Sequence, residues 1–301
     1  MKLIESSVEI IPQESGLEGI YKQIERAGRL CYKSEDKICE GSAEKMVENL
    51  IKRQHGSPLE HGTVYMTFKW WQIGKKLKYV FNKYSKIRRF KYVTSNYRVL
   101  VENNWLDDLQ YLCEPTNHHE KRITVKMNCS IGISREFNRH RVNSICETST
   151  RYCNYSKDKF GNEITFVIPE WVKDIMNDIA SSIDWVTGQI QDYILQMPMT
   201  ETVRIHGPVL SRAVNCWIDS LKKAESDYMY LITEEELKPQ NARSVLPLDT
   251  ATEVVYTAYS SDWEHFVSLR TAQGAHPDAR ILANNLRWLL ESSNLINCVR
   301  K

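Results

Sequence analysis

The feature that most constrains the fold is a strict alternation of apolar and polar residues over positions 123–129. The two kinds of side chain take turns there, in the order Ile123, Thr124, Val125, Lys126, Met127, Asn128 and Cys129. Successive side chains of a strand point to opposite faces of a sheet, so this pattern predicts a strand with one buried face. The chain therefore contains a sheet that is covered on one side.

Amphipathic helices are predicted on both sides of this strand in the sequence. Apolar residues recur at steps of three and four from Leu17 to Cys31 and again from Ala43 to Ile51, where Ser42 can cap the second helix. Four more helices are expected along the chain: a long one from Pro169 whose apolar stripe runs to Ile190, one over about 208–237, one from Ser261 with a capping box to Glu264, and one from Pro277.

Further segments are typical of strands. Residues 61–68 and 252–259 are rich in Val, Thr and Tyr, and residues 92–101 have a similar composition. No repeat, low-complexity tract or linker separates the elements. The simplest organisation is therefore one α+β domain over residues 1–301. A stretch rich in lysine and aromatic residues, at about 70–121, is harder to assign.

The charge balance limits the classes of partner. The chain has 40 Lys and Arg against 38 Asp and Glu, which gives a formal net charge of +2. A balance this close to zero gives no general attraction to nucleic acid, so any basic site must be local. We therefore expect no nucleic-acid partner.

The sequence also has the features of a cytoplasmic protein. Its eight cysteines are scattered and form no CxxC pair, which is typical of free thiols in a reducing compartment. The first residues, MKLIESSVEI, lack the basic region and apolar run of a signal peptide. No stretch approaches the ~18 consecutive apolar residues of a membrane span. We expect a soluble, cytoplasmic protein without a membrane partner.

One arginine stands out on the helix expected from Ser261. Trp263, Phe266 and Val267 define the apolar face of that helix, and Arg270 continues the same face at the next helical step. An unpaired guanidinium is very costly to bury, so Arg270 needs an anion or several acceptors. The alternative is an arginine that extends to the surface or pairs with a structural carboxylate.

A second group of candidate residues lies in the stretch RHRVNSICETSTRY, at positions 139–152. A short helix capped by Ser134 would carry Glu136, Arg139 and His140 on one side. If the chain beyond it is extended, Glu147, Ser149 and Arg151 share one face. Arginine matches phosphate oxygens in a bidentate manner, so these residues suit a phosphate cradle. A solvated basic patch is the alternative.

Other kinds of site find little support. The sequence contains neither GxxxxGK[ST] nor GxGxxG, so no P-loop and no Rossmann-type dinucleotide site is indicated. Residues 117–120 read NHHE, but no second ligand pair has zinc-like spacing, so a polar loop is favoured and no metal is expected. Cys146 is interpreted as a structural thiol. Ser149 as a nucleophile would need a base, for which His140 is the only near candidate.

Four blocks of the sequence, taken in order, resemble one family. RHRVNSICETS has an Arg-His-Arg triple, seven intervening residues and then Ser149, which matches the signature of the flavin-dependent thymidylate synthases, and the match extends through STRY. The other three blocks are SPLEHGTVYMTF at 57–68, ARSVLPLDTATEVVYT at 242–257 and FVSLRTAQGAHPDAR at 266–280. Together the blocks cover roughly a third of the chain.

The resemblance implies a reductive methylation of dUMP to dTMP. In this family the methylene group comes from methylenetetrahydrofolate and the reducing equivalents come from NADPH through FAD. The fold is α+β with a central antiparallel sheet flanked by helices, and the active sites lie between the subunits of a homotetramer. No protein nucleophile attacks the pyrimidine ring. The alternatives are a nucleotide- or RNA-binding module without catalysis and a degenerate family member.

The matching motifs also imply roles for single residues. The resemblance assigns FAD binding to Arg139, His140, Arg141, Glu147 and His265, and places His61 and Thr63 against the flavin of a neighbouring subunit. It assigns dUMP binding to Glu136, Arg139, Glu147, Ser149, Arg151, Arg243 and Arg270. Arg270 would sit at the uracil and favour ionisation of its ring nitrogen 3, where negative charge develops.

The sequence departs from the family pattern at a few positions. Glu136 replaces a glutamine that many members have, and Tyr259 lies where the family has an asparagine-containing turn. His265 occupies a position often held by asparagine, from which it could still bind the cofactor. Residues 70–121 exceed what a compact member needs, so we expect an insertion there within the single domain.

Overall fold

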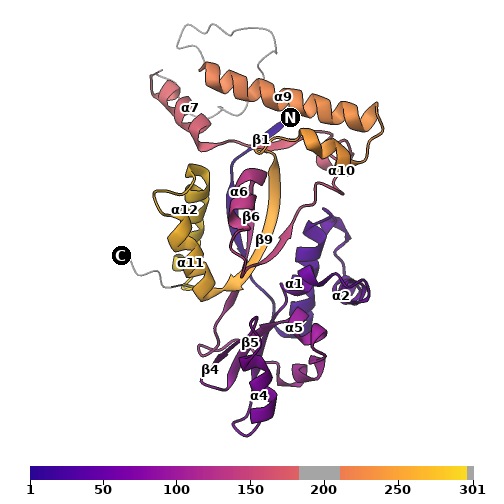
Figure 1. Cartoon of the computed structure of the whole chain (residues 1–301), viewed down its shortest axis with the longest axis vertical. Helices are drawn as coiled ribbons and strands as arrows, with labels where there is room; N and C mark the ends of the chain where they lie inside the picture. Colours follow the sequence, from indigo (N-terminus) through magenta and orange to yellow (C-terminus); the bar gives the residue numbers. More distant parts are fainter. Residues whose placement is uncertain (183–210, 297–301) are drawn as a thin grey trace. The chain divides into compact units, whose positions relative to one another are not determined.

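The computed structural model of the chain describes residues 1–182 and 211–296, which combine helices with strands (Figure 1). The chain divides into two compact units. The first unit consists of residues 1–7, 128–136 and 149–252, and the second unit consists of residues 8–127, 137–148 and 253–301. The single domain expected over 1–301, with its insertion, stays a prediction.

The first unit packs helices against a small parallel sheet. Strand β1 (Lys2–Ile4) pairs in parallel with β8 (Thr165–Val167). The helical elements of this unit are α6 (Ile131–Phe137), η3 (Asp158–Phe160), α7 (Glu170–Ser182), α9 (Arg212–Thr233), α10 (Pro239–Ala242) and η4 (Arg243–Val245). Leu3, Phe166, Val172 and Leu221 belong to one buried cluster, so the apolar faces of α7 and α9 share a core with the strands.

Two of the expected helices belong to this unit. α7 begins after Pro169, as predicted, and α9 confirms the helix expected over about 208–237 within its described part. The remainder of the stripe from Pro169, which was expected to run to Ile190, lies outside the described residues from position 183.

The second unit contains two sheets. A four-stranded sheet has the order β2 (Ser7–Ile11), β6 (Arg122–Ser130), β9 (Ala251–Tyr259) and β7 (Ser144–Glu147), with β7 and β9 antiparallel. A few residues at its ends belong to the first unit. A three-stranded antiparallel sheet has the order β3 (Thr63–Thr67), β5 (Tyr92–Asn96) and β4 (Lys86–Arg88). Antiparallel pairing thus agrees with the expected fold class, while the β1–β8 pair departs from it.

The stretch of alternating residues at 123–129 lies in strand β6. The apolar positions of its alternating stretch are all buried, as predicted for a covered face: Ile123, Val125, Met127 and Cys129. Figure 1 shows β6 beside β9, its neighbour in the strand order. The sequence pattern therefore located the central strand correctly.

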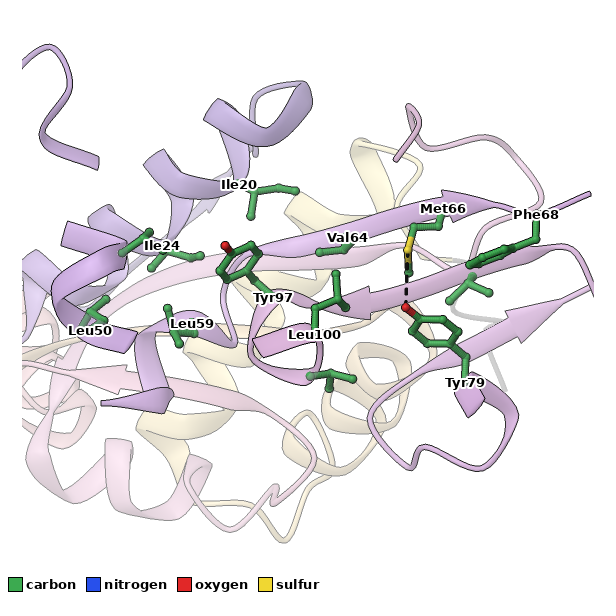
Figure 2. Close-up of a cluster of buried hydrophobic side chains, with 13 residues drawn as sticks. Ile20, Ile24, Leu50, Leu59, Val64, Met66, Phe68, Tyr79, Tyr97 and Leu100 are labelled. Carbon is green, nitrogen blue, oxygen red and sulfur yellow. Dashed lines mark hydrogen bonds between the residues drawn. The ribbon is translucent and has the colours of Figure 1, made fainter. Parts of the chain in front are cut away.

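Helices and short turns complete the second unit. They are α1 (Gly16–Leu30), η1 (Glu35–Lys37), α2 (Ser42–Lys52), α3 (Gly56–Leu59), α4 (Ile73–Val80), α5 (Tyr97–Glu102), η2 (Leu106–Tyr111), α11 (Ser260–Arg270) and α12 (Pro277–Ser292). Figure 2 shows side chains of α1 (Ile20, Ile24) with those of β3 (Val64, Met66) in one cluster. Full burial of such side chains contributes ~1.5–3 kcal/mol each.

Three predicted helix caps are wrong. The Ser42 hydroxyl donates to Glu25 and accepts from the backbone N–H of Cys39, so Gly41, with φ of 71°, takes the cap position of α2. Ser134 lies inside α6, which begins directly after β6, and Ser130 Oγ accepts from the N–H of Ile133 instead.

The third cap fails for a similar reason. Ser261 is the second residue of α11, and its hydroxyl donates to Glu120 at 2.6 Å rather than capping the helix. In all three cases a contact from another part of the chain, or an earlier serine, replaces the local hydrogen bond that the sequence suggested.

The strand-like stretch 92–101 is also only partly a strand. β5 ends at Asn96, whose side-chain oxygen accepts from the N–H of Val99 at 3.1 Å and caps α5. An asparagine three residues before that amide is a recognised helix start, so the sequence did carry a signal that the composition obscured. Among the helices of residues 1–182 and 211–296, none is long and apolar enough to cross a membrane.

Candidate functional site

Arg270 lies at the end of α11 and is held by a histidine of the opening motif. Its Nε donates to Nε2 of His140 at 3.0 Å. The guanidinium carbon lies 5.7 Å from the ring centroid of Phe137, and the His140 ring packs on Phe266 with centroids 4.7 Å apart. Arg270 is half-buried, so it extends from the apolar face of the helix to the edge of the core.

The imidazole of His140 that accepts from Arg270 is neutral. Burial, followed by the positive charge of Arg270 and by His265, lowers the pKa of His140 to about 4. Because Nε2 accepts the hydrogen bond from Arg270, the ring proton resides on Nδ1 at neutral pH. The pair therefore keeps one full positive charge on Arg270 and presents one N–H donor on His140.

Three residues connect the motif to the central sheet. Asn138 Nδ2 donates to Glu147 at 3.4 Å, and the Tyr256 hydroxyl donates to Asn138 Oδ1 at 2.8 Å. Glu147 ends β7 and is paired with Val254 of β9. Nothing in the sequence singled out Asn138 or Tyr256 as site residues. Their only signal was that Asn138 directly precedes the motif block and Tyr256 lies on a predicted strand.

His61 and Thr63 occupy a separate, buried position. His61 is fully buried, and its Nδ1 lies 2.8 Å from the Thr257 hydroxyl. Burial, with a smaller contribution from the charge of Arg122, lowers the pKa of His61 to about 3. Thr63 is also buried, and its hydroxyl accepts from Arg122 at 3.4 Å. Arg122 thus lies close to both residues, and nothing in the sequence pattern singled it out.

His61 also has an unused nitrogen. Its Nε2 is buried and has no hydrogen-bond partner in the described part of the chain. The next residue, Gly62, packs so closely on α1 that an added Cβ would lie 2.7 Å from Ile24 Cδ1. A larger residue would push His61 away from the helix, so the glycine is needed to seat it.

The two groups lie on opposite faces of β9. Tyr256 contacts Asn138, and the adjacent Thr257 contacts His61. Neighbouring residues of a strand point to opposite faces, so strand β9 itself lies between His61 and the group of Asn138 and Glu147. The candidate residues of the second unit that lie next to β9 are therefore divided between the two faces of one sheet.

Residues 149–151 do not continue the strand, which corrects the extended face predicted for Glu147, Ser149 and Arg151. β7 ends at Glu147, and the chain then turns because the N–H groups of Tyr152 and Cys153 both donate to the carbonyl of Ser149, at 3.1 and 2.9 Å. Buried Cys153 anchors the turn.

The turn nevertheless gathers predicted residues within the first unit. Arg243 Nη1 donates to the Thr150 hydroxyl at 3.2 Å, and the N–H of Arg151 lies 3.4 Å from the hydroxyl of Ser149. The side chains of Arg151 and Arg243 are exposed. Two guanidinium groups beside two hydroxyls are a donor set that suits an anion with several oxygens.

The remaining predicted residues are more loosely placed. The helix that was expected to carry Glu136, Arg139 and His140 on one side ends at Phe137, and the N–H of His140 closes a turn to the Phe137 carbonyl at 3.0 Å. The shared helical face is therefore wrong, because the turn interrupts it. Glu136 is the last residue of α6 that belongs to the first unit, and Arg139 is exposed in the second.

Two more predicted residues are exposed in the second unit, namely Arg141 and His265. Arg141 follows His140 in the turn after α6. The ring of His265, on α11, lies 6.2 Å from that of His140, measured between centroids.

Tyr259, which lies where the family has an asparagine-containing turn, is held by backbone groups. The Tyr259 hydroxyl donates to the carbonyls of Tyr84 and Thr94, both at 2.9 Å, so this buried side chain is engaged by the backbone.

The neighbouring Cys31 thiol and burial raise the pKa of Cys146 well above its usual value, which keeps it protonated. Within residues 1–182 and 211–296 no group of three or more His, Cys, Asp or Glu could hold a metal ion.

Comparison with known proteins adds a family and two solved structures. The family model described as "Thymidylate synthase complementing protein" matches residues 17–74 and 114–292. A UMP/dUMP methylase PolB from Streptomyces cacaoi bound with 5-Br UMP is 17% identical, with 98% of this chain and 92% of that chain covered and a TM-score of 0.44. The structure of the same methylase bound with 5-Br dUMP is 16% identical, with 100% of both chains covered and a TM-score of 0.43. No curated protein matches the chain.

Proposed function

The chain belongs to the family of the thymidylate synthase complementing protein and is a methyltransferase, and from this membership we propose its reaction. The chain converts dUMP to dTMP by FAD-dependent reductive methylation, with methylenetetrahydrofolate as the methylene donor and NADPH as the reductant. The enzyme works in the cytoplasm.

The observation that carries the proposal is the pair formed by Arg270 and His140. A neutral histidine fixes the guanidinium without cancelling its charge, since Nε2 accepts a hydrogen bond and carries no negative charge. The C-terminal end of a helix, where Arg270 lies, also favours a cation, because the partial charge of the macrodipole there is negative. Arg270 is thus a positive charge placed in advance, and we assign it to the uracil ring, where negative charge develops during transfer.

The residues of the first unit suit the phosphate of the nucleotide. Arg151 and Arg243 are exposed guanidinium groups, and Ser149 and Thr150 supply hydroxyl donors beside them. Arginine binds phosphate oxygens with two parallel hydrogen bonds, so this donor set fits a monophosphate. Glu136, Arg139 and Glu147 are assigned to the rest of dUMP.

The residues of the second unit suit FAD. Arg139 and Arg141 are exposed cations that can meet a pyrophosphate, and His140 carries a donor at Nδ1 by its protonation state. Glu147 and His265 are assigned to the same cofactor. When bound, FAD supplies the transfer of reducing equivalents from NADPH to the substrate, and the protein side chains bind and orient both molecules.

The separation of His61 from this group favours an assembly. His61 and Thr63 lie on the opposite face of β9 from the group of Asn138 and Glu147, and His61 keeps one buried nitrogen without a partner. We assign His61 and Thr63 to the flavin of a neighbouring subunit, in a homotetramer whose active sites lie between chains. A buried nitrogen without a hydrogen-bond partner destabilises the folded protein, so binding of a ligand or subunit that forms a hydrogen bond with it would be favoured.

An absorbance spectrum tests the proposal first. Purified protein is titrated with FAD from roughly 300 to 550 nm, before and after dUMP, and dTMP formation is then assayed with methylenetetrahydrofolate and NADPH. We expect a bound-flavin band that shifts with dUMP, followed by turnover. Absence of flavin binding would favour the non-catalytic nucleotide-binding alternative, and flavin binding without turnover would favour the degenerate member.

A further inference from the structure

The segment of residues 69–91, called here the basic–aromatic segment, has a composition unlike the rest of the chain. It contains nine Lys and Arg residues and no Asp or Glu. Thus 31 of the 40 Lys and Arg remain for the rest of the chain against all 38 Asp and Glu, so the rest carries a net charge of −7. The near-neutral total conceals a strong local positive charge. Most of the segment lies in residues 75–113, which the family model leaves unmatched.

The segment also exposes large apolar side chains. Of the 20 exposed large hydrophobic residues in the described part of the chain, eight lie within residues 70–90. Five of the eight are aromatic, with these exposed fractions: Trp70 77%, Trp71 57%, Phe81 84%, Tyr84 54% and Phe90 48%. Such a concentration on one short segment marks an interaction surface rather than the usual scatter of single exposed residues.

Helix α4 shows that this exposure is built into the fold. Its buried side chains are Tyr79, whose hydroxyl donates to Asp108 at 2.7 Å, and Lys76, whose Nζ donates to the Trp70 carbonyl at 3.1 Å. Figure 2 shows Tyr79 directed at Met66 in the core. The helix is therefore firmly anchored by polar side chains, and its apolar residues face outward.

The turn between β4 and β5 presents two more of these side chains. The N–H of Lys91 donates to the Arg88 carbonyl at 3.1 Å, and both residues between them have positive φ, 48° at Arg89 and 49° at Phe90. Such turns favour Asn and Gly, and the left-handed conformation costs other residues roughly 1–2 kcal/mol each. An exposed arginine and phenylalanine at these positions are more readily explained by a ligand than by the stability of the turn.

Several cations of the segment are available to an anion. Lys78 pairs with Asp108, and Lys86 and Arg88 pair with Glu120. Among the described residues no ion pair is found for the exposed side chains of Lys69, Lys75, Lys83, Arg89 and Lys91.

These cations also lie next to the aromatic rings. Lys83 Nζ is 4.8 Å from the ring centroid of Tyr84, and Lys69 Nζ is 5.2 Å from that of Trp71. In sequence Arg89 and Lys91 flank Phe90. Charge for a phosphate and a flat apolar surface for a base thus recur together along the segment.

We propose that the basic–aromatic segment binds single-stranded nucleic acid. Proteins that do so combine a positive surface along the phosphates with aromatic side chains on which bases stack. This inference goes beyond the proposed function and does not depend on it. It also reverses the expectation that the chain has no nucleic-acid partner, because that expectation rested on the total charge.

Two other occupants fit the observations less well. A contact between two copies of the segment would bring like charges together across a low-dielectric interface, which is unfavourable. An anionic membrane surface would be met by one apolar helical face, but all five exposed aromatic residues lie outside the bounds of α4, at positions 70, 71, 81, 84 and 90. Separate rings, each close to a cation, match separate bases better than a continuous lipid phase.

Fluorescence anisotropy with labelled dT20 and rU20 tests the proposal on the full-length protein. We expect binding of both oligomers at 50 mM salt, and a loss of roughly 50-fold in affinity at 200 mM salt if about four phosphates are contacted. An abasic oligomer of the same length should bind at least about tenfold more weakly, because it has phosphates but no bases to stack.

Variants locate the binding on the segment. Trp70→Ala and Phe81→Ala should each weaken dT20 binding by about tenfold, which corresponds to loss of one stacked base. Lys83→Ala combined with Lys91→Ala should lower the salt dependence. The matched controls are Trp288→Ala, an aromatic residue of α12 that is 67% exposed, and Lys45→Ala with Lys52→Ala on α2, none of which should change binding. Thermal melting confirms that each variant is folded.

Three outcomes would overturn the proposal. Equal binding of the abasic and the intact oligomer would reduce the segment to a non-specific positive patch. Binding of vesicles that contain 30% phosphatidylserine, without binding of either oligomer, would assign it to a membrane. Loss of the oligomeric state in Phe81→Ala, measured by light scattering, without any oligonucleotide binding by the parent protein would assign it to an interface between copies.

Discussion

Two regions of the second unit use positive charge in opposite ways. Arg270 is half-buried and held by a neutral histidine beside an aromatic ring, so its charge has a defined position. In the basic–aromatic segment the five cations without an ion pair among the described residues are exposed, and each is one of several. The first arrangement suits the stabilisation of charge at one reacting atom, and the second suits a repeating polyanion.

The difference leads to different expectations for single substitutions. A charge that acts at one point cannot be replaced by a neighbour, so its removal should have a large effect. A charge that contributes to a distributed field is one term among many, so its removal should have a small and salt-dependent effect. The size of the effect of single substitutions therefore separates the two modes.

The largest effect is expected for Arg270→Ala. Loss of a donor that stabilises developing charge typically costs 10²–10³ in kcat, and we expect a loss of about that size in dTMP formation, with weaker dUMP binding and retained FAD. Steady-state assays with a flavin titration measure this. The control is Arg287→Ala on α12, where the arginine only pairs with Glu291 at 3.0 Å. Wild-type turnover in Arg270→Ala would remove the functional assignment of this residue.

The buried histidines give the next effect, on the pH dependence of stability. The pKa of His61 is about 3 in the folded protein, below the ~6.5 of an unfolded chain, so the unfolded state binds more protons as the pH falls. The stabilisation is complete above about pH 6.5 and decreases toward pH 3, with a loss of about 2 kcal/mol already at pH 5. Chemical denaturation at pH 7.5 and 5.0 measures it.

His61→Gln tests the source of that dependence, since glutamine does not titrate. The variant should be less stable at pH 7.5 but should lose less stability on acidification than the parent. The exposed His55, changed to Gln, is the control and should leave the pH dependence as it was. An unchanged slope in His61→Gln would mean that other groups, such as His140 with its pKa of about 4, dominate.

A smaller effect is expected for Arg139→Ala, whose exposed cation is assigned to both ligands. Loss of one charge-assisted hydrogen bond is worth ~1.5–3 kcal/mol, so FAD and dUMP should each bind at least about tenfold more weakly. Flavin fluorescence titrations, with and without dUMP, measure both affinities. Arg135→Ala, an exposed arginine on α6, should change neither. Unchanged FAD affinity in Arg139→Ala would contradict the shared role.

Much of the fold followed from periodicity, while the caps did not. The apolar positions of β6 and α1 pack into a core, so their spacing predicted these elements, and Pro277 predicted the start of α12. Ser42 and Ser261 failed as caps because Glu25 and Glu120, distant in sequence, compete for their hydroxyls. Local rules describe a hydroxyl correctly only when no tertiary partner reaches it.

The candidate site shows the same limit. The apolar stripe of α11 marked Arg270 as unusual, but no pattern revealed that His140, 130 residues away, would hold it. The extended face of Glu147, Ser149 and Arg151 failed because a turn starts at Ser149. In the basic–aromatic segment the composition was visible in the sequence, whereas the outward direction of the apolar side chains of α4 depends on Tyr79 and Lys76 turning inward.

The smallest effect is expected for Lys83→Ala in the basic–aromatic segment. One phosphate contact contributes a slope of about −0.7 to the dependence of log K on log salt, so its loss should weaken dT20 binding by about fivefold at 0.1 M salt and by almost nothing near 1 M. Anisotropy titrations at several salt concentrations give the slope. A loss that salt does not diminish would mean that Lys83 acts at a fixed point, as Arg270 does, and the division between placed and distributed charge would fail in this segment.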